Sequence, residues 1–451
     1  MSIRFAPPSA FRLLRMRSGI LFSLFAAAGV GCGAGTDAAR PQAGPPDLVR
    51  QVRFAPSSAP EIAPPALREA ADRAARYLAR ACDAEGQFAY RINLDPSIEP
   101  QPRYNVVRHA GTLYALAQYC QRSADPEARA ALLRAAGFLR QRCVAPVAGN
   151  PNFLGVWSDP ELVGGDRPRQ VKLGSNALGL VALLSVEKVE PGFTPLDDLR
   201  KIGRFLIFMQ ASDGNFYSKY DPERGRTDLG RSQYYPGEAA LGLVMLYEVD
   251  PAHRWLHTAT KALEHLAKQG SREKSTFPDH WYLLTLEQWF EVGRDQYGSH
   301  VRHRLLEHAR RLCRDMLADQ QRQIDMAQIS GCFTSDGRTC PTATRLEGLT
   351  AALQYLPRED DQLRGEIRRA VEQGLLFLLD SQVVDGPHAG AVARYKLGFR
   401  PDGCSSSEEQ RLQEVRIDYV QHALSAMLAG QEEFSVQTSS QMDGGPAEEA
   451  L

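Results

Sequence analysis

The alternation of two kinds of helical segment constrains the fold of this 451-residue chain most strongly. Six segments open with polar or glycine residues and then become apolar, and six plainer amphipathic segments lie between them. This alternation predicts an all-α fold, an (α/α)6 toroid of twelve alternating outer and inner helices. The expected inner helices, which carry the motifs, cover residues 105–121, 173–187, 236–249, 279–292, 343–356 and 416–430. The expected outer helices cover residues 66–82, 126–143, 195–211, 251–269, 299–320 and 361–381.

The plain segments have clear start signals and a single apolar stripe. Asp125, Thr194 and Asp250 each precede a proline, which puts a capping side chain just before the first helical turn. From Leu67 to Leu78, apolar residues recur at helical spacing with charged residues opposite. The motif segments contain more small residues, which let helices pack closely, and we therefore assign them to the inner ring.

Long connections follow the outer helices. In an up-and-down toroid, all of these connections lie at the end where the inner helices begin. Long loops of a compact domain usually carry function, so this end is the expected mouth of a site. The connections cover residues 83–104, 144–172, 212–235, 270–278, 321–342 and 382–415.

A short turn recurs after three of the outer helices. Asp83–Phe88, Ser212–Phe216 and Val384–Pro387 each contain a glycine after an acidic residue. Glycine at such a place can take a positive φ angle. The recurrence resembles the turn of terpenoid cyclases and related α/α toroids.

Charge and motif content exclude several classes of function. The formal net charge is −1, so there is no basic surface for nucleic acid, and we expect no nucleic-acid partner. The hydrophobic content of 43% is that of a globular protein with a real core. The sequence has neither a phosphate-binding P-loop nor a His-Glu-x-x-His zinc motif. We expect no cofactor and no metal.

The N-terminus has the order of a bacterial export signal. Four arginines precede an apolar run at residues 19–31, which is too short to span a membrane. The run ends at Cys32 in Gly-Val-Gly-Cys, which resembles a lipobox, although glycine stands where leucine is usual. The resemblance implies a signal peptide over residues 1–32, lipid on Cys32 and a place in the cell envelope. Ordinary cleavage to a periplasmic protein is the alternative, and translation could start at Met1 or Met16.

The remainder of the chain divides into three parts. Residues 33–65 are rich in Pro, Ala and Gly and form the expected flexible tether. Residues 66–430 form the toroid domain, and residues 431–451 are expected to be a disordered tail. Cys332 and Cys340 share a loop and are the best candidates for a disulfide, which an exported protein permits.

Charged, hydrogen-bonding and aromatic side chains gather where the inner helices begin. Carboxylates and imidazoles can move protons, and the expected catalytic residues are Glu238, Asp279, His280, Glu347 and His422. Arginines bind anionic groups, and aromatic faces stack on sugar rings. The expected substrate-binding residues are Tyr104, Asn105, Arg108, His109, Asn176, Tyr234, Tyr235, Trp281, Arg345, Arg416 and Asp418.

Each of these residues also has a purely structural interpretation. Asp279 stands where a helix N-cap is expected. Glu238 and Glu347 could form buried ion pairs with Arg345 or Arg108, and a single histidine is as often a hydrogen-bonded core residue. The convergence of the whole set on one cavity, walled by the long loops, favours a site.

By helix count and motif placement, residues 66–430 resemble the six-hairpin glycosidase-like superfamily. This superfamily includes glycoside hydrolases, polysaccharide lyases and the N-acylglucosamine 2-epimerase family. In its epimerase-like members, histidines and a glutamate on inner helices exchange a proton beside a sugar carbonyl. His280, with Glu287 on the same helix, and His422 on the last inner helix loosely match those positions. The long insertions before the first and last motifs depart from that family.

Three functions follow as expectations. The first is an exported, membrane-tethered carbohydrate-active enzyme, similar to glycoside hydrolases, with acid–base carboxylates at the mouth. Arg108, Arg345 and Arg416 would favour an anionic glycan as its substrate. The second is a sugar epimerase or lyase that uses His280 and His422 as an acid–base pair. The third is a non-catalytic envelope lipoprotein that binds a glycan or a protein, and no oligomeric state follows from the sequence.

Overall fold

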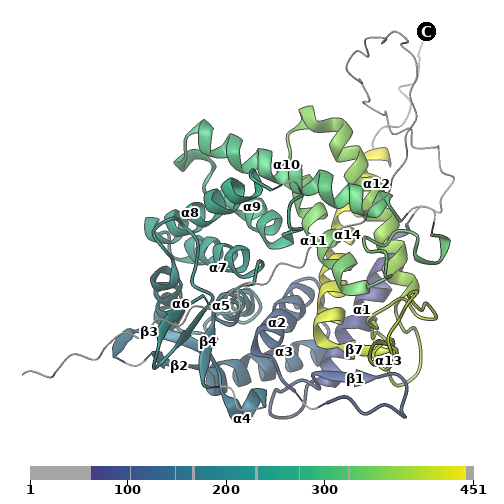
Figure 1. Ribbon diagram of the computed structural model, residues 1–451, viewed down its shortest axis with the longest axis horizontal. Helices are drawn as coiled ribbons and strands as arrows, with labels where there is room; N and C mark the ends of the chain where they lie inside the picture. The colour runs from purple at the N-terminus through teal and green to yellow at the C-terminus, as the bar shows by residue number, and fades with distance from the viewer. Residues whose placement is uncertain are drawn as a thin grey trace, which may run out of the picture. The chain divides into compact units, whose positions relative to one another are not determined.

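The computed structural model describes residues 62–442, apart from 102, 148, 165–167, 229–231, 274 and 324–325. In this part of the chain, twelve helices of seven or more residues alternate between inner and outer positions (Figure 1). The inner helices are α2 (Val106–Cys120), α5 (Leu173–Glu187), α7 (Tyr235–Val249), α9 (His280–Val292), α11 (Thr339–Tyr355) and α14 (Ile417–Met442). The outer helices are α1 (Pro64–Ala81), α3 (Pro126–Phe138), α6 (Leu196–Met209), α8 (His253–Gly270), α10 (Ser299–Gln321) and α12 (Asp361–Asp380). The toroid prediction is confirmed, whereas the signal peptide, Cys32 and most of the tether lie outside the described residues.

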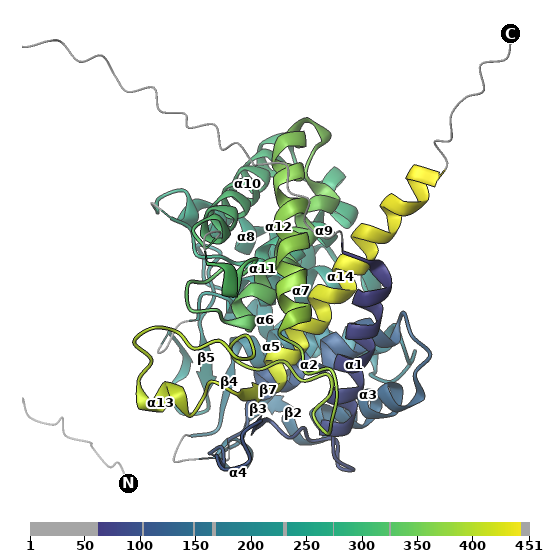
Figure 2. The same ribbon diagram turned by 90° about the vertical axis from the view of Figure 1, so that its right-hand side faces the viewer.

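The inner helices form a closed ring. Each packs against the next in chain order, from α2 through α5, α7, α9 and α11 to α14, and α14 packs against α2. The outer helices cover this ring, with α8, α10 and α12 outside α7, α9 and α11 in Figure 1. The first helix, α1, lies beside the last, α14 (Figure 2). Among the described residues, no helix is both long and apolar enough to cross a membrane.

The outer ring repeats one ion pair between successive outer helices. An arginine on α1, α6 or α10 binds an aspartate that precedes the next outer helix, about 50 residues later. In each pair the arginine Nε lies close to the aspartate Oδ2. The pairs and these distances are Arg76–Asp125 (3.1 Å), Arg200–Asp250 (3.0 Å) and Arg310–Asp360 (2.8 Å).

The recurring turn places a glycine against the backbone of a neighbouring outer helix. Gly86 has a φ angle of 88°, and a side-chain carbon there would lie 2.2 Å from the Arg134 carbonyl oxygen. After α12, the glycine with this role is Gly390, where a side-chain carbon would lie 1.9 Å from the Arg73 carbonyl oxygen. The sequence interpretation had given this role to Gly386, which has nothing within 4 Å of such a carbon. Only glycine fits at these contacts.

The long connections carry short antiparallel strands, which the sequence analysis did not predict. One sheet pairs β1 (Arg91–Asn93) with β7 (Glu414–Arg416). The other sheet has the order β2-β3-β4-β5-β6, formed by Val144–Val147, Asn150–Ser158, Gln170–Lys172, Lys219–Asp221 and Gly225–Thr227. Every strand lies between an outer helix and the following inner helix, so both sheets border the motif end. Most of these strands have three or four residues, which is too short for a readable alternation.

The last inner helix is longer than expected, because α14 continues to Met442. Residues 431–442 are therefore helical and do not belong to a disordered tail. Glu432 binds Arg122 at the end of α2, and Glu433 binds Arg368 of α12 at 2.9 Å, which anchors the helix beyond residue 430. Residues 443–451 lie outside the described part of the chain.

The expected disulfide between Cys332 and Cys340 is not formed. All seven cysteines of the described residues are free thiols. The Cys332 Sγ lies 3.2 Å from Thr342 Oγ1 and is buried in that loop. The loop is thus held by hydrogen bonds, without a covalent link.

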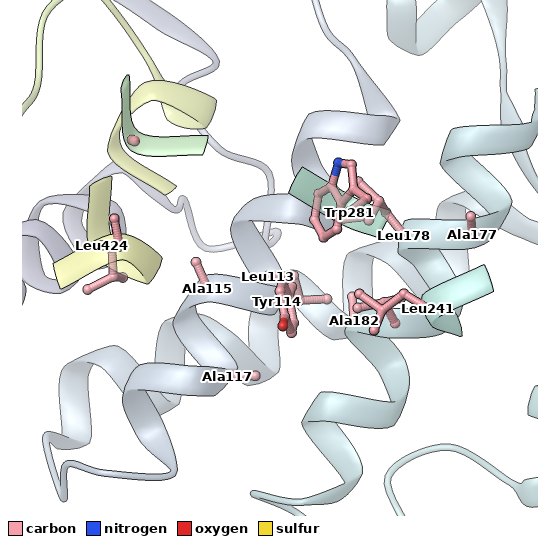
Figure 3. Packing of buried hydrophobic residues seen from close by; sticks show 14 of the residues in the cluster. Leu113, Tyr114, Ala115, Ala117, Ala177, Leu178, Ala182, Leu241, Trp281 and Leu424 are labelled. Atoms are coloured by element: carbon pink, nitrogen blue, oxygen red, sulfur yellow. The ribbon is translucent and has the colours of Figure 1, made fainter. Parts of the chain in front are cut away.

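Apolar side chains of the inner helices form the core at the ring axis. Figure 3 shows them gathered between α2, α5, α7 and α9. Each fully buried leucine there stabilises the fold by about 1.5–3 kcal/mol. Tyr114 of α2 and Trp281 of α9 meet with ring centroids 6.3 Å apart. Since α2 and α9 are opposite helices of the ring, this contact crosses the ring axis and fills the space there.

Candidate active site

Three polar side chains from three inner helices meet near the axis. His280 begins α9, Glu347 lies on α11 and His422 lies on α14. The Nδ1 atom of His422 is 2.7 Å from Oε1 of Glu347. The rings of His280 and His422 are 5.5 Å apart at 80°. We call these three residues the His–Glu–His cluster, and all three were expected catalytic residues.

His280 is the unusual member of the cluster. It is 2% exposed, and neither ring nitrogen has a hydrogen-bond partner among the described residues. Burial, with smaller effects of His422 and Arg345, holds its pKa well below the usual range, so the ring is neutral at pH 7. A buried polar group without a partner costs about 1–3 kcal/mol. An unpaired imidazole at this position therefore indicates a ligand-binding or catalytic role.

The local backbone fixes the position of His280. Asp279 caps α9, because its Oδ1 accepts the Tyr282 N–H at 3.1 Å, and this orients the first helical residue. Gly348 of α11 provides the space, since a side-chain carbon there would lie 3.0 Å from the Cα and Cβ of His280. The N-cap interpretation of Asp279 is therefore correct.

Tyr234, Trp281 and Arg345 surround His280. The ring of Tyr234 lies 5.4 Å and that of Trp281 4.7 Å from the His280 ring. Arg345 donates from Nη1 to the Pro341 carbonyl at 2.9 Å, while its buried Nε has no partner in the described residues. The cluster therefore has aromatic faces and an unused N–H donor beside it.

Glu238 and Asp279 are two buried carboxyl groups that interact electrostatically. Glu238 is 4% exposed, and its Oε2 has no hydrogen-bond partner within the described chain. Burial, and then Asp279, raises the pKa of Glu238 to about 8. Burial raises the pKa of Asp279 to about 7, although the Tyr282 N–H opposes the shift. Both carboxyl groups can therefore hold a proton near neutral pH.

Asp418 binds two of the expected substrate-binding arginines. Arg108 Nε lies 2.7 Å from Asp418 Oδ2, and Arg416 forms two bonds of 3.0 and 2.8 Å to the same carboxylate. Burial opposes ionisation of Asp418, but the two guanidinium groups outweigh it and hold its pKa below the usual range. Two of the three arginines expected to attract an anionic substrate thus compensate a buried carboxylate of the protein itself.

His109 and Tyr104 are not part of the cluster. The His109 Nδ1 lies 2.7 Å from the Tyr104 hydroxyl, and its Nε2 lies 3.0 Å from the Ala135 carbonyl of α3. Burial lowers the pKa of His109 to about 4. Asn105, another expected binding residue, caps α2 by accepting the Val107 N–H. These three side chains have packing and capping roles in place of the expected substrate contacts.

Asn176 is also satisfied inside the fold. Its Oδ1 accepts the Val156 N–H at 2.9 Å, and its amide donates to the Ile202 carbonyl of α6 at 3.2 Å. Tyr235 packs against Gly174, where a side-chain carbon would lie 2.3 Å from the ring. Asn176 thus ties an inner helix to the backbone of the next outer helix, as His109 does.

A cavity of about 780 Å³ opens at the end of the ring opposite the motifs. Its wall is formed by residues of the inner helices together with Arg364 and Arg368 of the outer helix α12, and Glu347 is the one expected catalytic residue in it. The sequence predicted a site at the motif end, whereas this cavity lies at the other end. The Tyr114–Trp281 contact fills the axis between the two ends. Thr350 and Ser425 also line this cavity and were not among the expected site residues. Their signal was a spacing of one turn from Glu347 and His422.

The His–Glu–His cluster also bears on the prediction that no metal binds. One ligand atom from each member lies within 4.8 Å of the other two, and no other group of this kind occurs in the described residues. Neutral imidazoles and a carboxylate are typical zinc ligands. The prediction of no metal is therefore open to a direct test.

Several solved structures with this fold are named as enzymes of carbohydrates. Neither a protein-family model nor a curated protein matches the sequence. A D-mannose isomerase superposes with a TM-score of 0.60 at 13% identity, covering 81% of this chain and 97% of its own. The cellobiose 2-epimerase of Bacillus thermoamylovorans gives 0.59 at 12% identity, with coverages of 81% and 99%. A GH76 α-mannanase of Bacteroides thetaiotaomicron gives 0.54 at 9% identity, with coverages of 82% and 97%. The chain therefore has the fold of the six-hairpin glycosidase-like toroids, as the sequence analysis predicted.

Proposed function

We propose that the protein is a sugar epimerase or isomerase in which His280 and His422 move a proton beside the sugar carbonyl. The observation that carries this proposal is an unpartnered, neutral His280 facing a His422 whose Nδ1 is paired with Glu347. Imidazoles accept and donate protons near neutral pH, as such a reaction requires. The mannose isomerase and cellobiose 2-epimerase of the same fold support a carbohydrate substrate.

The geometry assigns a role to each member of the cluster. Neutral His280 removes the proton from the carbon beside the carbonyl, and the electron pair of the C–H bond passes into an enediolate. Arg345 donates an N–H to the oxygen that becomes negative. His422, whose Nδ1 lies 2.7 Å from Oε1 of Glu347, returns a proton. Return to the same carbon from the opposite face gives the epimer. Return to the former carbonyl carbon, with transfer of the neighbouring hydroxyl proton to the former carbonyl oxygen, gives the isomer.

Isotope exchange tests this proposal directly. Mannose, glucose or cellobiose incubated with the protein in D₂O is expected to yield the epimer with deuterium at C2, or the ketose with deuterium at C1. His280→Ala and His422→Ala are expected to lower turnover by about 10²–10⁴-fold. His300→Ala, which removes an exposed histidine of α10, is the matched control and keeps full activity. Full turnover in His280→Ala would overturn the proposal, and saturable sugar binding without exchange would replace it by glycan binding.

Glycoside hydrolysis is the second candidate, favoured by the unpartnered carboxyl of Glu238. A pKa of about 8 keeps this group protonated near neutrality, as a general acid requires. Release of reducing ends from a mannan or a uronate polymer, lost in Glu238→Gln and kept in His280→Ala, would identify this activity. Unsaturated products would identify a lyase instead.

A chelator tests the expected absence of a metal. Dialysis against EDTA is expected to leave the exchange reaction unchanged, because proton transfer between two imidazoles requires no Lewis acid. Loss of activity, with recovery on addition of Zn²⁺, would assign an ion to the His–Glu–His cluster.

Export and a lipid anchor on Cys32 are a separate proposal, supported by the arginine-rich and then apolar N-terminal sequence. Expressed in a bacterial host, the full chain is expected in the membrane fraction, and Cys32→Ser is expected to release it. Unchanged membrane association of Cys32→Ser would exclude this anchor.

A further inference from the structure

The cavity at the end of the ring opposite the motifs has a chemistry of its own. Its volume of about 780 Å³ lies within the range of small-molecule sites, about 300–1,000 Å³, and far exceeds the space that a single ion needs. Glu287 and Gln288 of α9 and Thr350 of α11 form part of its wall. The activity proposed above does not use any of these three residues.

The basic residues of this cavity already have partners. Arg122 binds Glu432, Lys188 binds Glu248 at 3.3 Å, and Arg368 binds Glu433. Arg364 donates to the backbone carbonyls of Leu353 and Leu356. Three of these cations are thus compensated by carboxylates, and Arg364 is the one cation of the described wall that could offset part of the remaining negative charge.

Two carboxylates in the wall have no such partner. Glu287 and Glu291 lie one turn apart on α9, and neither forms an ion pair or a side-chain hydrogen bond within the described residues. Burial, and then repulsion by Glu291 and Glu432, raises the pKa of Glu287 to about 7. The uncompensated charge of this cavity is negative.

The other free groups of the wall are oxygen atoms. The Oγ1 atom of Thr350, a residue that is 3% exposed, has no hydrogen-bond partner in the described chain. The buried Oε1 atom of Gln288 is also unpartnered there. The helices α2, α5, α7, α9 and α11 all end at this side, and helix C-termini carry partial negative charge. The cavity thus presents unpartnered acceptor oxygens beside two glutamates.

We propose that this cavity binds a small organic cation with several N–H donors, such as a linear diamine, with the ammonium groups held by Glu287, Glu291 and the oxygens of Gln288 and Thr350. An ammonium group supplies three donors and a positive charge, which matches what the wall lacks. Glu347 of the His–Glu–His cluster also borders this cavity, but the proposed diamine contacts use other residues and do not depend on the sugar chemistry.

Calorimetric titration of the full chain with 1,4-diaminobutane tests the proposal. Saturable binding is expected, and the neutral analogue 1,4-butanediol is expected not to bind. Glu287→Gln and Glu291→Gln are each expected to weaken diamine binding by about tenfold. Glu85→Gln, which alters an exposed loop glutamate, is the matched control and leaves binding unchanged.

Three outcomes would overturn the proposal. The first is no saturable binding of the diamine. The second is diamine binding by Glu287→Gln and Glu291→Gln that is as tight as that of the unaltered protein, and the third is binding of the diol that is as tight as that of the diamine. Thermal unfolding of each variant establishes that it is folded before titration, and the second glutamate variant serves if the first fails to fold. Sugar turnover does not enter the readout, so failure of the proposed epimerase or isomerase activity would leave this result intact.

Discussion

The outer ring and the centre of the inner ring are built differently. In the outer ring the same contact recurs from one helix pair to the next, as with Arg200–Asp250 and Arg310–Asp360. At the centre the polar residues do not recur. The positions near the start of α2 and α5 hold His109 and Asn176, which bind backbone carbonyls, whereas α9 brings the unpartnered His280 there.

The difference separates residues that hold the fold from residues that are free to react. A recurring, satisfied contact stabilises each helix pair in the same way and requires no ligand. A buried group that occurs once and lacks a partner is a local cost to stability, which a fold retains where function requires it. Among the described residues, His280, Glu238 and Arg345 each have a buried polar atom without a hydrogen-bond partner.

The sharpest way to test this distinction is to replace His280 by an apolar ring. His280→Phe is expected to lower sugar turnover by about 10³-fold while the melting temperature stays constant or rises. The reason is that the variant removes a buried polar group that had no partner. Initial rates and calorimetric unfolding measure the two effects. A large loss of stability would place His280 among the structural residues.

The opposite pattern is expected in the outer ring for Gly390→Ala. The substitution forces a side-chain carbon against the Arg73 carbonyl at a φ angle of 94°, so the free energy of unfolding is expected to fall by about 3 kcal/mol. Turnover per folded molecule is expected to stay unchanged. Gly386→Ala, at a φ angle of 73° with open space, is the control and costs about 1 kcal/mol. Equal losses of stability in Gly390→Ala and Gly386→Ala would show that the contact with the Arg73 carbonyl does not cause the loss.

The acidic pair of the centre predicts an unusual dependence of stability on pH. The pKa of Glu238 is raised from 4.5 to about 8, so the folded state holds a proton that the unfolded state releases above about pH 4.5. This contribution to stability is present at low pH and is lost as the pH rises from about 4.5 to 8, by about 1.4 kcal/mol per pH unit. Urea unfolding between pH 5 and 8 measures the slope. Glu238→Gln is expected to remove the contribution of Glu238 to this slope and to leave that of Asp279. An unchanged slope would assign the titration to another group.

The smallest effect is expected for a single outer ion pair. Arg200→Met is expected to lower the free energy of unfolding by about 1 kcal/mol, because the arginine is 37% exposed and water screens its pairing with Asp250. Turnover is expected to remain that of the unaltered protein. A loss of activity without a loss of stability would show that the outer ring also shapes the centre.

The helices were predictable from the sequence because each signal was local. Asp125 before Pro126 starts an outer helix in the sequence and in the structure, with the Asp125 side chain accepting two backbone N–H groups. The caps expected from Thr194 and Asp250 are not formed, because α6 and α8 begin without a side-chain cap. The extension of α14 to Met442 was not predictable, since Glu432 and Glu433 are held by residues far away in the chain. The short strands were not predictable for the same reason, because each pairs with a strand that is distant in the sequence or in another part of a loop.

The site was predictable in part. Proximity to an inner-helix start correctly brought His280, Glu347 and His422 together. The same rule wrongly included His109 and Asn176, whose partners lie on the outer helix that follows. Sequence position gives the end of the ring on which a side chain lies. It does not give the direction in which the side chain points, and that direction separates a reactive imidazole from a structural one.

The closure of the ring by α14 also bears on how the chain is made. Arg108 of α2 meets Asp418 of α14 across 310 residues of sequence, so this contact has to wait until nearly the whole chain has left the ribosome. Until then, the apolar faces of α2 and α11 that α14 covers stay open to solvent. Synthesis runs at about 5–20 residues per second, so the nascent protein is exposed in this way for tens of seconds. A chain cut before α14 would keep those faces exposed, and it would become a client of chaperones or proteases in place of a smaller folded domain.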